Sequence, residues 1–321
     1  MNRPKIATRD AYGRTLIELG RENTDIVALD ADLAGSTRTE WFAKEFPERF
    51  IDVGVAEENL ITVAAGLATA GKMPFASTFA VFATERAFNQ IRQSVALCNL
   101  NVKIVSSHGG VSVGEDGASH HSILDIALMR IIPNMTVVVP ADAIETSLAT
   151  RAIAERLGPI YMRTGRSPVP QIYDENFGFE GKKLKYEMGK ALILKDGHDV
   201  AIIATGLMVS EALSAADQLA TEDIKARVID MHTIKPLDTG TIVRAAIDCG
   251  AIVTAEEHTI LGGLGSAVAE ASVSSIPVPI EMVGVRDLFT LSGSTDVLFE
   301  EYGLSTRHIV EAARRAYERK K

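Results

Sequence analysis

Short runs of β-branched and apolar residues alternate with longer segments of helical periodicity along the chain. This alternation constrains the fold more than any other feature, because strands separated by helices form parallel sheets that the helices cover. The run Thr136–Val139 is β-branched throughout, which indicates a strand buried on both sides of a sheet. The fold class we expect is therefore α/β, with two doubly wound domains whose sheets are mainly parallel.

The alternation is interrupted between Arg166 and Lys185, where Pro, Gly, Asn and charged residues replace the pattern. We place a linker there, so that residues 1–178 form the first domain and residues 186–321 form a second, smaller domain. The first domain is expected to contain strands at Asp25–Leu29, Phe50–Val53, Met73–Ser77, Val102–Ser106, Thr136–Pro140 and Pro159–Arg163, and helices at Glu57–Ala70, Thr84–Cys98, Ser122–Ile131 and Ala143–Leu157. The second is expected to contain strands at Asp199–Thr205, Ala226–Asp230, Ala251–Ala255 and Ile280–Val285, and helices at Val209–Ala220, Thr239–Cys249, Gly265–Ser274 and Thr306–Lys320.

The composition excludes several classes of function. The net charge of −9 argues against broad binding to nucleic acid or anionic membranes, although a local basic pocket could still hold a phosphate. Two widely separated cysteines, Cys98 and Cys249, do not suggest a disulfide framework. Met1–Lys5 has no apolar core of a secretory signal, and no stretch approaches the roughly 20 apolar residues that cross a bilayer. We therefore expect a cytoplasmic protein.

Ligands of open α/β sheets collect at the carboxyl ends of the strands. Segments of the first domain that follow expected strands hold many of its polar and aromatic residues: 30–37, 54–59, 78–84, 107–121 and 164–167. The sequence therefore predicts that a functional site, if present, lies in the first domain.

Glu57 opens a helix whose following positions on the same face are apolar: Leu60, Ile61, Ala64, Ala65 and Ala68. We expect Glu57 to point inward, whereas Glu58 shares an outer face with Thr62 and Thr69. Both acids could simply complement the positive end of the helix, and that interpretation is sufficient for Glu58. A carboxylate that enters a core needs a specific partner, which leaves the role of Glu57 open between a structural and a functional one.

Phe79 and Phe82 directly follow the strand expected at Met73–Ser77. If a helix begins there, this spacing places both rings on one side. Phenylalanine pairs usually belong to a core, and the spacing alone favours that interpretation. The alternative is a wall for a flat heteroaromatic ligand.

The segment Ser107–His121 contains three of the seven histidines of the chain, together with Asp116 and several glycines. A surface turn explains the glycines but not the density of histidines, and functional loops concentrate such residues. The adjacent pair His120 and His121 is poorly suited to bind one metal ion. Acid–base chemistry or hydrogen bonding to a hydroxylated ligand fits the loop better.

Arg163 and Arg166 follow the last strand expected in the first domain, where they could be solvated linker charges or could clamp a phosphate. The glycine-rich turn Gly262–Gly265 does not have the spacing of a dinucleotide loop, and the preceding Glu256 and Glu257 would repel phosphate. We interpret it as a tight turn into a helix.

Taken in order, these segments resemble the pyrimidine-binding and C-terminal domains of transketolases. The resemblance covers essentially the whole chain from Ala7 onward. It is carried by Ser77–Phe79, Arg86–Arg92, Ser107–Ser119, Arg163–Pro168, Thr233–Asp238 and Glu256–His258.

The resemblance implies a role for each candidate residue in thiamine-diphosphate chemistry. The glutamate that matches Glu57 hydrogen-bonds the pyrimidine ring of the cofactor and promotes the tautomer that removes the thiazolium proton. Phe79 and Phe82 match residues that stack on the pyrimidine, and Asp32 resembles an acid near the cofactor at a subunit interface. The remaining matches concern the sugar: His120 at the reacting carbons, Asp116 at a sugar hydroxyl, and Ser36, His108 and Arg166 at the phosphate.

The implied reaction is transfer of a two-carbon ketol unit between phosphorylated sugars, as in the pentose phosphate pathway. The part of the family that binds the diphosphate through Mg²⁺ or another divalent ion, with its Gly-Asp-Gly motif, has no counterpart in the sequence. The closest segment, Gly114–Gly117, has an inserted Glu and already matches the sugar loop. We therefore expect an N-terminal partner subunit that holds the metal, and a homodimer of this chain within an α2β2 assembly. Glu85 stands where some transketolases have a third ring, which leaves the extent of the ring wall open.

Three alternatives remain at this point. The β subunit of a 2-oxoacid dehydrogenase is also a free-standing pair of these two domains, but the loop around Asp116 and the segment Arg163–Pro168 favour transketolase. A deoxyxylulose phosphate synthase shares Glu57 and the loop histidine, although its pyrimidine segment is shorter. A non-catalytic regulatory subunit is disfavoured because Glu57, Asp116 and His120 are retained.

Overall fold

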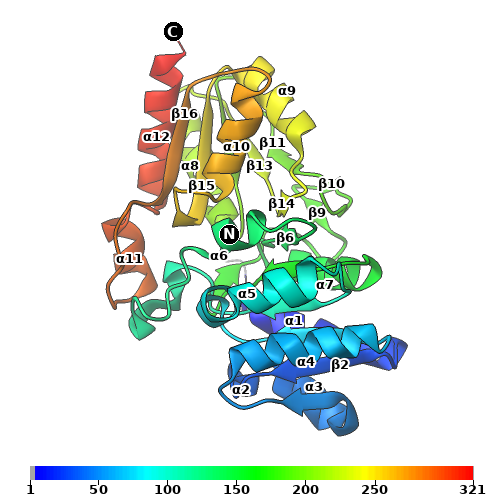
Figure 1. The fold of residues 1–321 in the computed structure, drawn as a ribbon. Helices are drawn as coiled ribbons and strands as arrows, with labels where there is room; N and C mark the ends of the chain where they lie inside the picture. The colour runs from blue at the N-terminus through cyan, green and yellow to red at the C-terminus, as the bar shows by residue number, and fades with distance from the viewer. Residues whose placement is uncertain (1–3, 321) are drawn as a thin grey trace.

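The computed structural model describes residues 4–320, which fold into two α/β sheet domains stacked along the long axis of the molecule (Figure 1). The predicted domain limits at residues 1 and 321, and the start of the segment Met1–Lys5, lie outside the described residues. The α/β fold class is confirmed. None of the helices described between residues 4 and 320 combines the length and apolar character needed to cross a membrane.

The first sheet has seven strands in the order β14-β6-β7-β5-β4-β2-β3. Six of them are parallel to one another and lie where the sequence predicts strands, to within two residues at each end: β2 (Ile26–Asp30), β3 (Phe50–Asp52), β4 (Met73–Ser77), β5 (Lys103–Ser106), β6 (Thr136–Val138) and β7 (Ile160–Arg163). The central strands are buried throughout, as expected for a sheet covered on both faces.

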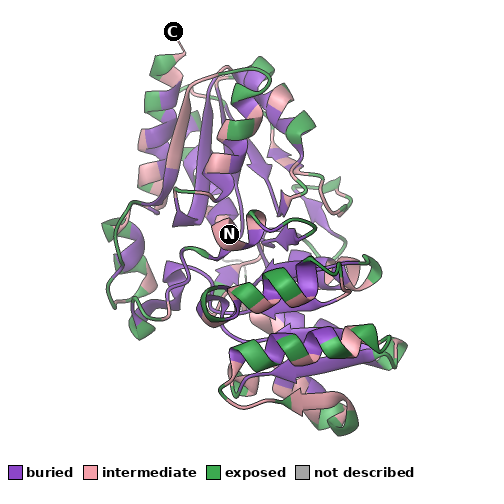
Figure 2. Cartoon of the chain, in the orientation of Figure 1, coloured by how far each residue is buried: buried purple, intermediate pink, exposed green. Residues whose placement is uncertain are grey.

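Helices cover both faces of this sheet, and their outer surfaces are the exposed parts of the domain (Figure 2). They are α1 (Thr8–Glu22), α2 (Ala34–Thr37), α3 (Thr39–Glu45), α4 (Glu57–Thr69), α5 (Phe88–Gln90), α6 (Asp125–Arg130) and α7 (Ala143–Glu155). The predicted helix Thr84–Cys98 is instead a chain of short pieces, with π-helical turns at Phe82–Arg86 and Ile91–Ala96 on either side of α5. Such wide turns are rare and are frequently found at functional sites.

The second sheet has five strands in the order β11-β13-β12-β15-β16. The bounds are β11 (Leu192–Lys195), β12 (Val200–Ala204), β13 (Ala226–Asp230), β15 (Ile252–Thr259) and β16 (Ile280–Val285), and only β11 is antiparallel to its neighbour. The helices are α8 (Met208–Ala220), α9 (Thr239–Cys249), α10 (Leu264–Val273), α11 (Thr295–Glu301) and α12 (Thr306–Arg319). The bounds of α9 match the prediction because Asp238 caps its first turn and Gly250, at φ 69°, ends it.

The boundary between the two halves is less simple than the sequence suggests. β14 (Thr233–Lys235) comes from the second half of the chain, yet it pairs antiparallel with β6 at the edge of the first sheet. The stretch expected to be an irregular linker contains β8 (Pro168–Pro170), which pairs with β1 (Lys5–Ala7), and a small hairpin of β9 (Gly178–Phe179) and β10 (Lys182–Lys183). The largest hydrophobic core runs without a break from the first sheet into the second.

Candidate active site

Glu57 is the first residue of α4, and its side chain points into the protein as predicted. It is 6% exposed, whereas Glu58 beside it is exposed to solvent. The apolar face that Leu60, Ile61 and Ala64 form behind it is fully buried. The polar group near the Glu57 carboxylate is the Arg86 guanidinium, with Nη1 3.6 Å from Oε1 and an arginine side chain that is 57% exposed. A buried carboxylate at a helix N-terminus thus lies beside an exposed surface charge rather than a buried partner.

Phe79 and Phe82 form a stacked pair with ring centroids 5.7 Å apart and planes inclined by 16°, so the predicted placement on one side is confirmed. His108 stacks on Phe79 at 3.7 Å, and His120 meets Phe82 edge-on at 5.4 Å. The Arg86 guanidinium lies 4.7 Å from the centre of the Phe82 ring. These rings and Glu57 therefore share one neighbourhood through Arg86, and Glu85 lines a cavity together with Val81 and Ser119.

A second group of residues, called the basic pocket below, gathers positive charge around the buried His108 ring. The pKa of His108 is lowered to about 3, first by burial and then by the positive charges of Arg9, Arg166, His120 and Arg38. Its ring is therefore neutral at physiological pH, with Nδ1 2.7 Å from the Ser107 hydroxyl. The arginines remain the positive charges of this pocket.

The arginines of this pocket come from three separate segments. Arg9 on α1 donates to the Ser36 carbonyl at 3.0 Å, and its Nε is buried without a hydrogen-bond partner. Burial and the charges of Arg38 and Arg166 lower the pKa of Arg9. Arg166 donates to the Val113 carbonyl at 2.6 Å, with the same nitrogen 3.6 Å from Asp116 Oδ1. The structure thus brings Ser36, His108, Asp116 and Arg166 to one place.

Arg9 and Arg38 are members of this pocket that the sequence analysis did not single out. α1, α2 and α3 were not among the predicted elements, and these helices place both side chains. Arg38 is held by Asp10, with Nε 2.6 Å from Oδ1. The only sequence signal was that Ala7-Thr8-Arg9 opens the region of family resemblance.

Asp32 lies apart from the rings. It is exposed at the end of β2 with φ 63°, and its N–H donates to Asp52 Oδ1 at 3.0 Å. Within residues 4–320 the structure brings it into contact with neither Glu57 nor the phenylalanines. Its proposed place at a subunit interface stays a prediction.

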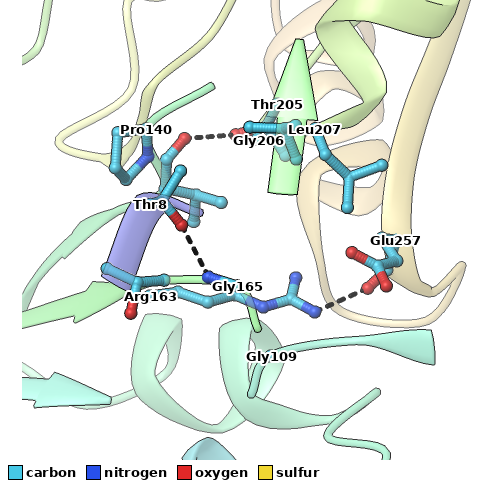
Figure 3. Close-up of a pocket in the computed structure, with 12 residues that line it drawn as sticks. Thr8, Gly109, Pro140, Arg163, Gly165, Thr205, Gly206, Leu207 and Glu257 are labelled. Atoms are coloured by element: carbon cyan, nitrogen blue, oxygen red, sulfur yellow. Dashed lines mark hydrogen bonds between the residues drawn. The ribbon is translucent and has the colours of Figure 1, made fainter. Parts of the chain in front are cut away.

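Arg163 is not part of the basic pocket, because its side chain is buried between the two domains. Figure 3 shows it reaching from β7 toward β15, where it donates to the Glu257 carbonyl at 2.8 Å. Its Nε also lies 3.3 Å from Asp125 Oδ2. Of the two arginines considered for a phosphate clamp, Arg163 is therefore engaged by buried groups of the protein, whereas Arg166 is partly exposed beside Asp116.

The acidic pair Glu256 and Glu257 on β15 is hydrogen-bonded within the protein. Burial raises the pKa of Glu257 to about 7, and its carboxylate accepts a hydrogen bond from the Ser112 N–H. Glu256 accepts from the N–H groups of Leu264 and Gly265 at 2.7 and 2.8 Å, so it caps the start of α10. The interpretation of Gly262–Gly265 as a turn into a helix is confirmed.

Comparisons with known proteins agree with this geometry. Residues 4–171 match the family profile described as "Transketolase, pyrimidine binding domain", and residues 189–309 match "Transketolase, C-terminal domain". The chain is thus a pyrimidine-binding α/β domain joined to a second α/β domain, the class that the fold and the strand-end site define. More specifically, it belongs to the transketolase family, whose domains imply dependence on thiamine diphosphate.

Its relatives include proteins of matching length. It is 49% identical over 304 residues to a putative transketolase C-terminal section of Methanocaldococcus jannaschii, covering 94% of both chains. It is 46% identical to the 6-deoxy-6-sulfo-D-fructose transketolase subunit SqwH of a Clostridium species, covering 97% of this chain and 95% of the relative. A solved structure described as a split gene transketolase, inactive beta4 tetramer, superposes with a TM-score of 0.89 at 50% identity, covering 99% of this chain and 100% of that one.

The residues present fit the pyrimidine half of such a cofactor. A buried carboxylate stands near the stacked Phe79–Phe82 pair, and the neighbouring Thr78 hydroxyl is buried without a partner. By contrast, residues 4–320 contain no cluster of three or more His, Cys, Asp or Glu side chains able to hold a metal ion. Thiamine diphosphate, when bound, supplies the electron sink for breaking and forming a carbon–carbon bond.

Proposed function

We propose that this chain is the C-terminal subunit of a transketolase that transfers a two-carbon ketol unit from a ketose phosphate to an aldose phosphate. The observation that carries the proposal is the buried Glu57 carboxylate at the start of α4, which lacks a buried partner and faces the neighbourhood of two stacked rings. A carboxylate in such a place is a hydrogen-bonding partner for the nitrogen of a stacked heterocycle.

Each side chain has a distinct task in this proposal. Glu57 holds a proton at the pyrimidine ring, and Phe79 and Phe82 orient that ring by stacking. His120, whose ring is edge-on to Phe82, places a proton or hydrogen bond at the reacting carbons of the sugar. Asp116 hydrogen-bonds a sugar hydroxyl, since its carboxylate is partly exposed beside Arg166.

In the same proposal, the basic pocket explains why the enzyme would prefer a substrate with an anionic end. Arg9, Arg38 and Arg166 surround a neutral His108 next to Ser36, and their three positive charges outnumber the two carboxylates beside them, Asp10 and Asp116. A dianionic phosphate would therefore meet several donors and an excess of positive charge. The relative that acts on a sulfo sugar, by its name, shows that an anionic end other than phosphate occurs in the family. A sulfonated ketose is therefore the second candidate substrate.

The partner subunit is part of the proposal. We propose that an N-terminal subunit supplies the divalent ion and holds the diphosphate, in a cytoplasmic α2β2 assembly where Asp32 lies at an interface. The name of the similar split transketolase, an inactive beta4 tetramer, supports the dependence on a partner. We also propose residues 1–178 and 186–321 as the two domains, with β14 as the part of the second that completes the first sheet.

Reconstitution tests the proposal directly. The purified chain, alone or mixed with an N-terminal transketolase subunit, is given thiamine diphosphate and Mg²⁺, and transfer from a ketose phosphate to an aldose phosphate is followed. We expect transfer only in the mixture. Full activity of the chain alone would refute the split-subunit hypothesis, and an inactive mixture that nevertheless binds the cofactor would favour a regulatory subunit.

A further inference from the structure

His120 and His121 are neighbours in the sequence but point to different parts of the protein. The His120 ring faces Phe82, whereas His121 is 3% exposed and turns toward the second domain. His121 Nδ1 lies 2.7 Å from the Thr290 hydroxyl, and Nε2 lies 2.9 Å from the Gly114 carbonyl. One imidazole therefore joins Gly114 and His121, which flank Asp116 and His120 in the loop 114–121, to a residue that is 169 positions away.

The two hydrogen bonds define the state of the His121 ring. A carbonyl oxygen can only accept, so Nε2 must donate its proton to Gly114. Burial is the main cause that lowers the pKa of His121, which keeps the ring neutral. Nδ1 then carries a lone pair and accepts the proton of the Thr290 hydroxyl. Removal of that hydroxyl would leave a buried acceptor unpaired, which is more costly than the loss of an exposed hydrogen bond.

Thr290 is held inward by a segment whose other side chains face outward. It is 2% exposed, whereas Phe289 and Leu291 on either side are 86% and 69% exposed. The Leu291 N–H donates to the Tyr302 hydroxyl at 2.7 Å, which fixes this turn to the end of α11. The hydroxyl that meets His121 is thus presented by a segment anchored in the second domain.

The segment that follows Thr290 also packs against the loop that carries Asp116 and His120. A Cβ added to Gly117 would lie 2.4 Å from the Ser292 hydroxyl oxygen, so the two segments touch where the loop has no side chain. The Thr295 hydroxyl donates to the Ser112 carbonyl at 3.3 Å. Asp116 and His120 lie on the loop between these contacts. The positions of Asp116 and His120 therefore depend on the contacts between this loop and the second domain.

We infer that His121 is a positioning residue which, together with Thr290, fastens the loop of Asp116 and His120 to the second domain. The second domain thereby contributes to sugar recognition without touching the sugar. This inference rests on the proposed function for the roles of Asp116 and His120. The His121–Thr290 link itself can be tested without any turnover.

The test uses T290V, which keeps the shape of the side chain and removes the hydroxyl, with T290S as the rescue variant. T306V is the matched control. Thr306, the first residue of α12, also donates its hydroxyl within the second domain, to the Glu211 carboxylate on α8. Hydrogen–deuterium exchange of the full chain follows the amides of Gly117, His120 and His121, which close the loop internally. We expect about tenfold faster exchange in T290V and unchanged exchange in T290S and T306V.

Steady-state kinetics of the reconstituted complex then separates positioning from general stability. We expect kcat/KM for the sugar donor to fall about tenfold in T290V, with the affinity for thiamine diphosphate unchanged, because Glu57 and the stacked rings lie on other segments. Unchanged loop exchange in T290V would overturn the inference, and so would faster exchange with unchanged kinetics at a temperature well below unfolding. If T290V folds poorly, T290A removes the same hydroxyl. Faster exchange in chains that never show ketol transfer would refute the proposed function but leave the link intact.

Discussion

Replacement of Glu57 by Gln removes the charge of one carboxylate and leaves its surroundings in place. Glutamine has the same shape, so α4 and the apolar face behind it should be undisturbed. The ion pair that is lost joins Glu57 to an arginine that is 57% exposed at 3.6 Å, and such a pair contributes about 0–1 kcal/mol. Glu57 also loses its interaction with the helix dipole, about 0.3–1 kcal/mol, so the expected loss of folding stability is at most about 2 kcal/mol.

The expected loss of activity is much larger. If Glu57 holds the proton that the cofactor needs, its removal should lower kcat by about 10²–10⁴-fold, the usual contribution of general acid–base catalysis. Thermal unfolding measures the first effect, and two-carbon transfer by the reconstituted complex measures the second. The contrast between a small stability change and a large rate change distinguishes a functional carboxylate from a structural one.

The chain offers a matched control in Glu58, which stands at the same helix end but is exposed. E58Q loses a similar interaction with the helix dipole, about 0.3–1 kcal/mol, and should keep full activity. Two results would refute the reasoning: an E57Q complex that retains its rate, or an E58Q complex that loses as much activity as E57Q. A large drop in the melting temperature of E57Q would assign the carboxylate to folding instead.

Three further predictions follow from the basic pocket, the loop and the domain interface. R9Q should raise KM for a phosphorylated sugar about 10–100-fold and leave the unphosphorylated sugar little affected, whereas exposed Arg14 on the same helix should be replaceable by Gln without effect. G117A should cost about 2–3 kcal/mol in urea unfolding, because φ +76° with ψ −172° is a region nearly confined to glycine and the Ser292 hydroxyl, 2.4 Å from the added carbon, must rotate away. G181A, at φ +79° in open space, should cost only about 1 kcal/mol. The folded chain keeps the Glu257 proton up to about pH 7, whereas an unperturbed glutamate releases it near 4.5. The stability of the wild type relative to E257Q should therefore decrease by roughly 2–3 kcal/mol as the pH rises from 5 to 8.

Each of these predictions has an outcome that contradicts it. Equal effects of R9Q on both sugars would mean that Arg9 does not contact the phosphate. Equal costs of the two glycine substitutions would show that the loop is not packed against the second domain. If the stability of the wild type relative to E257Q increased as the pH rises, the pKa of Glu257 would be lowered by folding rather than raised, and the prediction would be wrong.

Much of the fold follows from local patterns. Continuous apolar runs predict the central parallel strands because these are buried on both faces, and Asp238 and Gly250 define α9 through capping. β14 could not be predicted, since a three-residue strand is stabilised by its partner β6 and not by its own composition. The π-helical turns also depend on tertiary packing, because the helical period of the sequence is unbroken there.

The candidate site was predictable where one segment carries its own signal. The apolar period after Glu57 fixes the direction of that side chain, and its burial confirms it. Arg163 and Arg166 are three positions apart and chemically identical, so local sequence cannot show that Arg163 is the one engaged by distant groups, the Glu257 carbonyl and the Asp125 carboxylate. Arg9 joins the basic pocket through the packing of α1, which no spacing in the sequence reveals.

The place of β14 has a consequence for how the chain is made. On the ribosome, β6 emerges roughly 95 residues before the strand that covers its edge, which at about 5–20 residues per second is a delay of roughly 5–20 s. During that time the nascent first domain exposes an unpaired strand edge, the kind of surface that recruits other chains. A gene fragment that stops at the linker would make this state permanent. We therefore expect a first domain expressed by itself to aggregate.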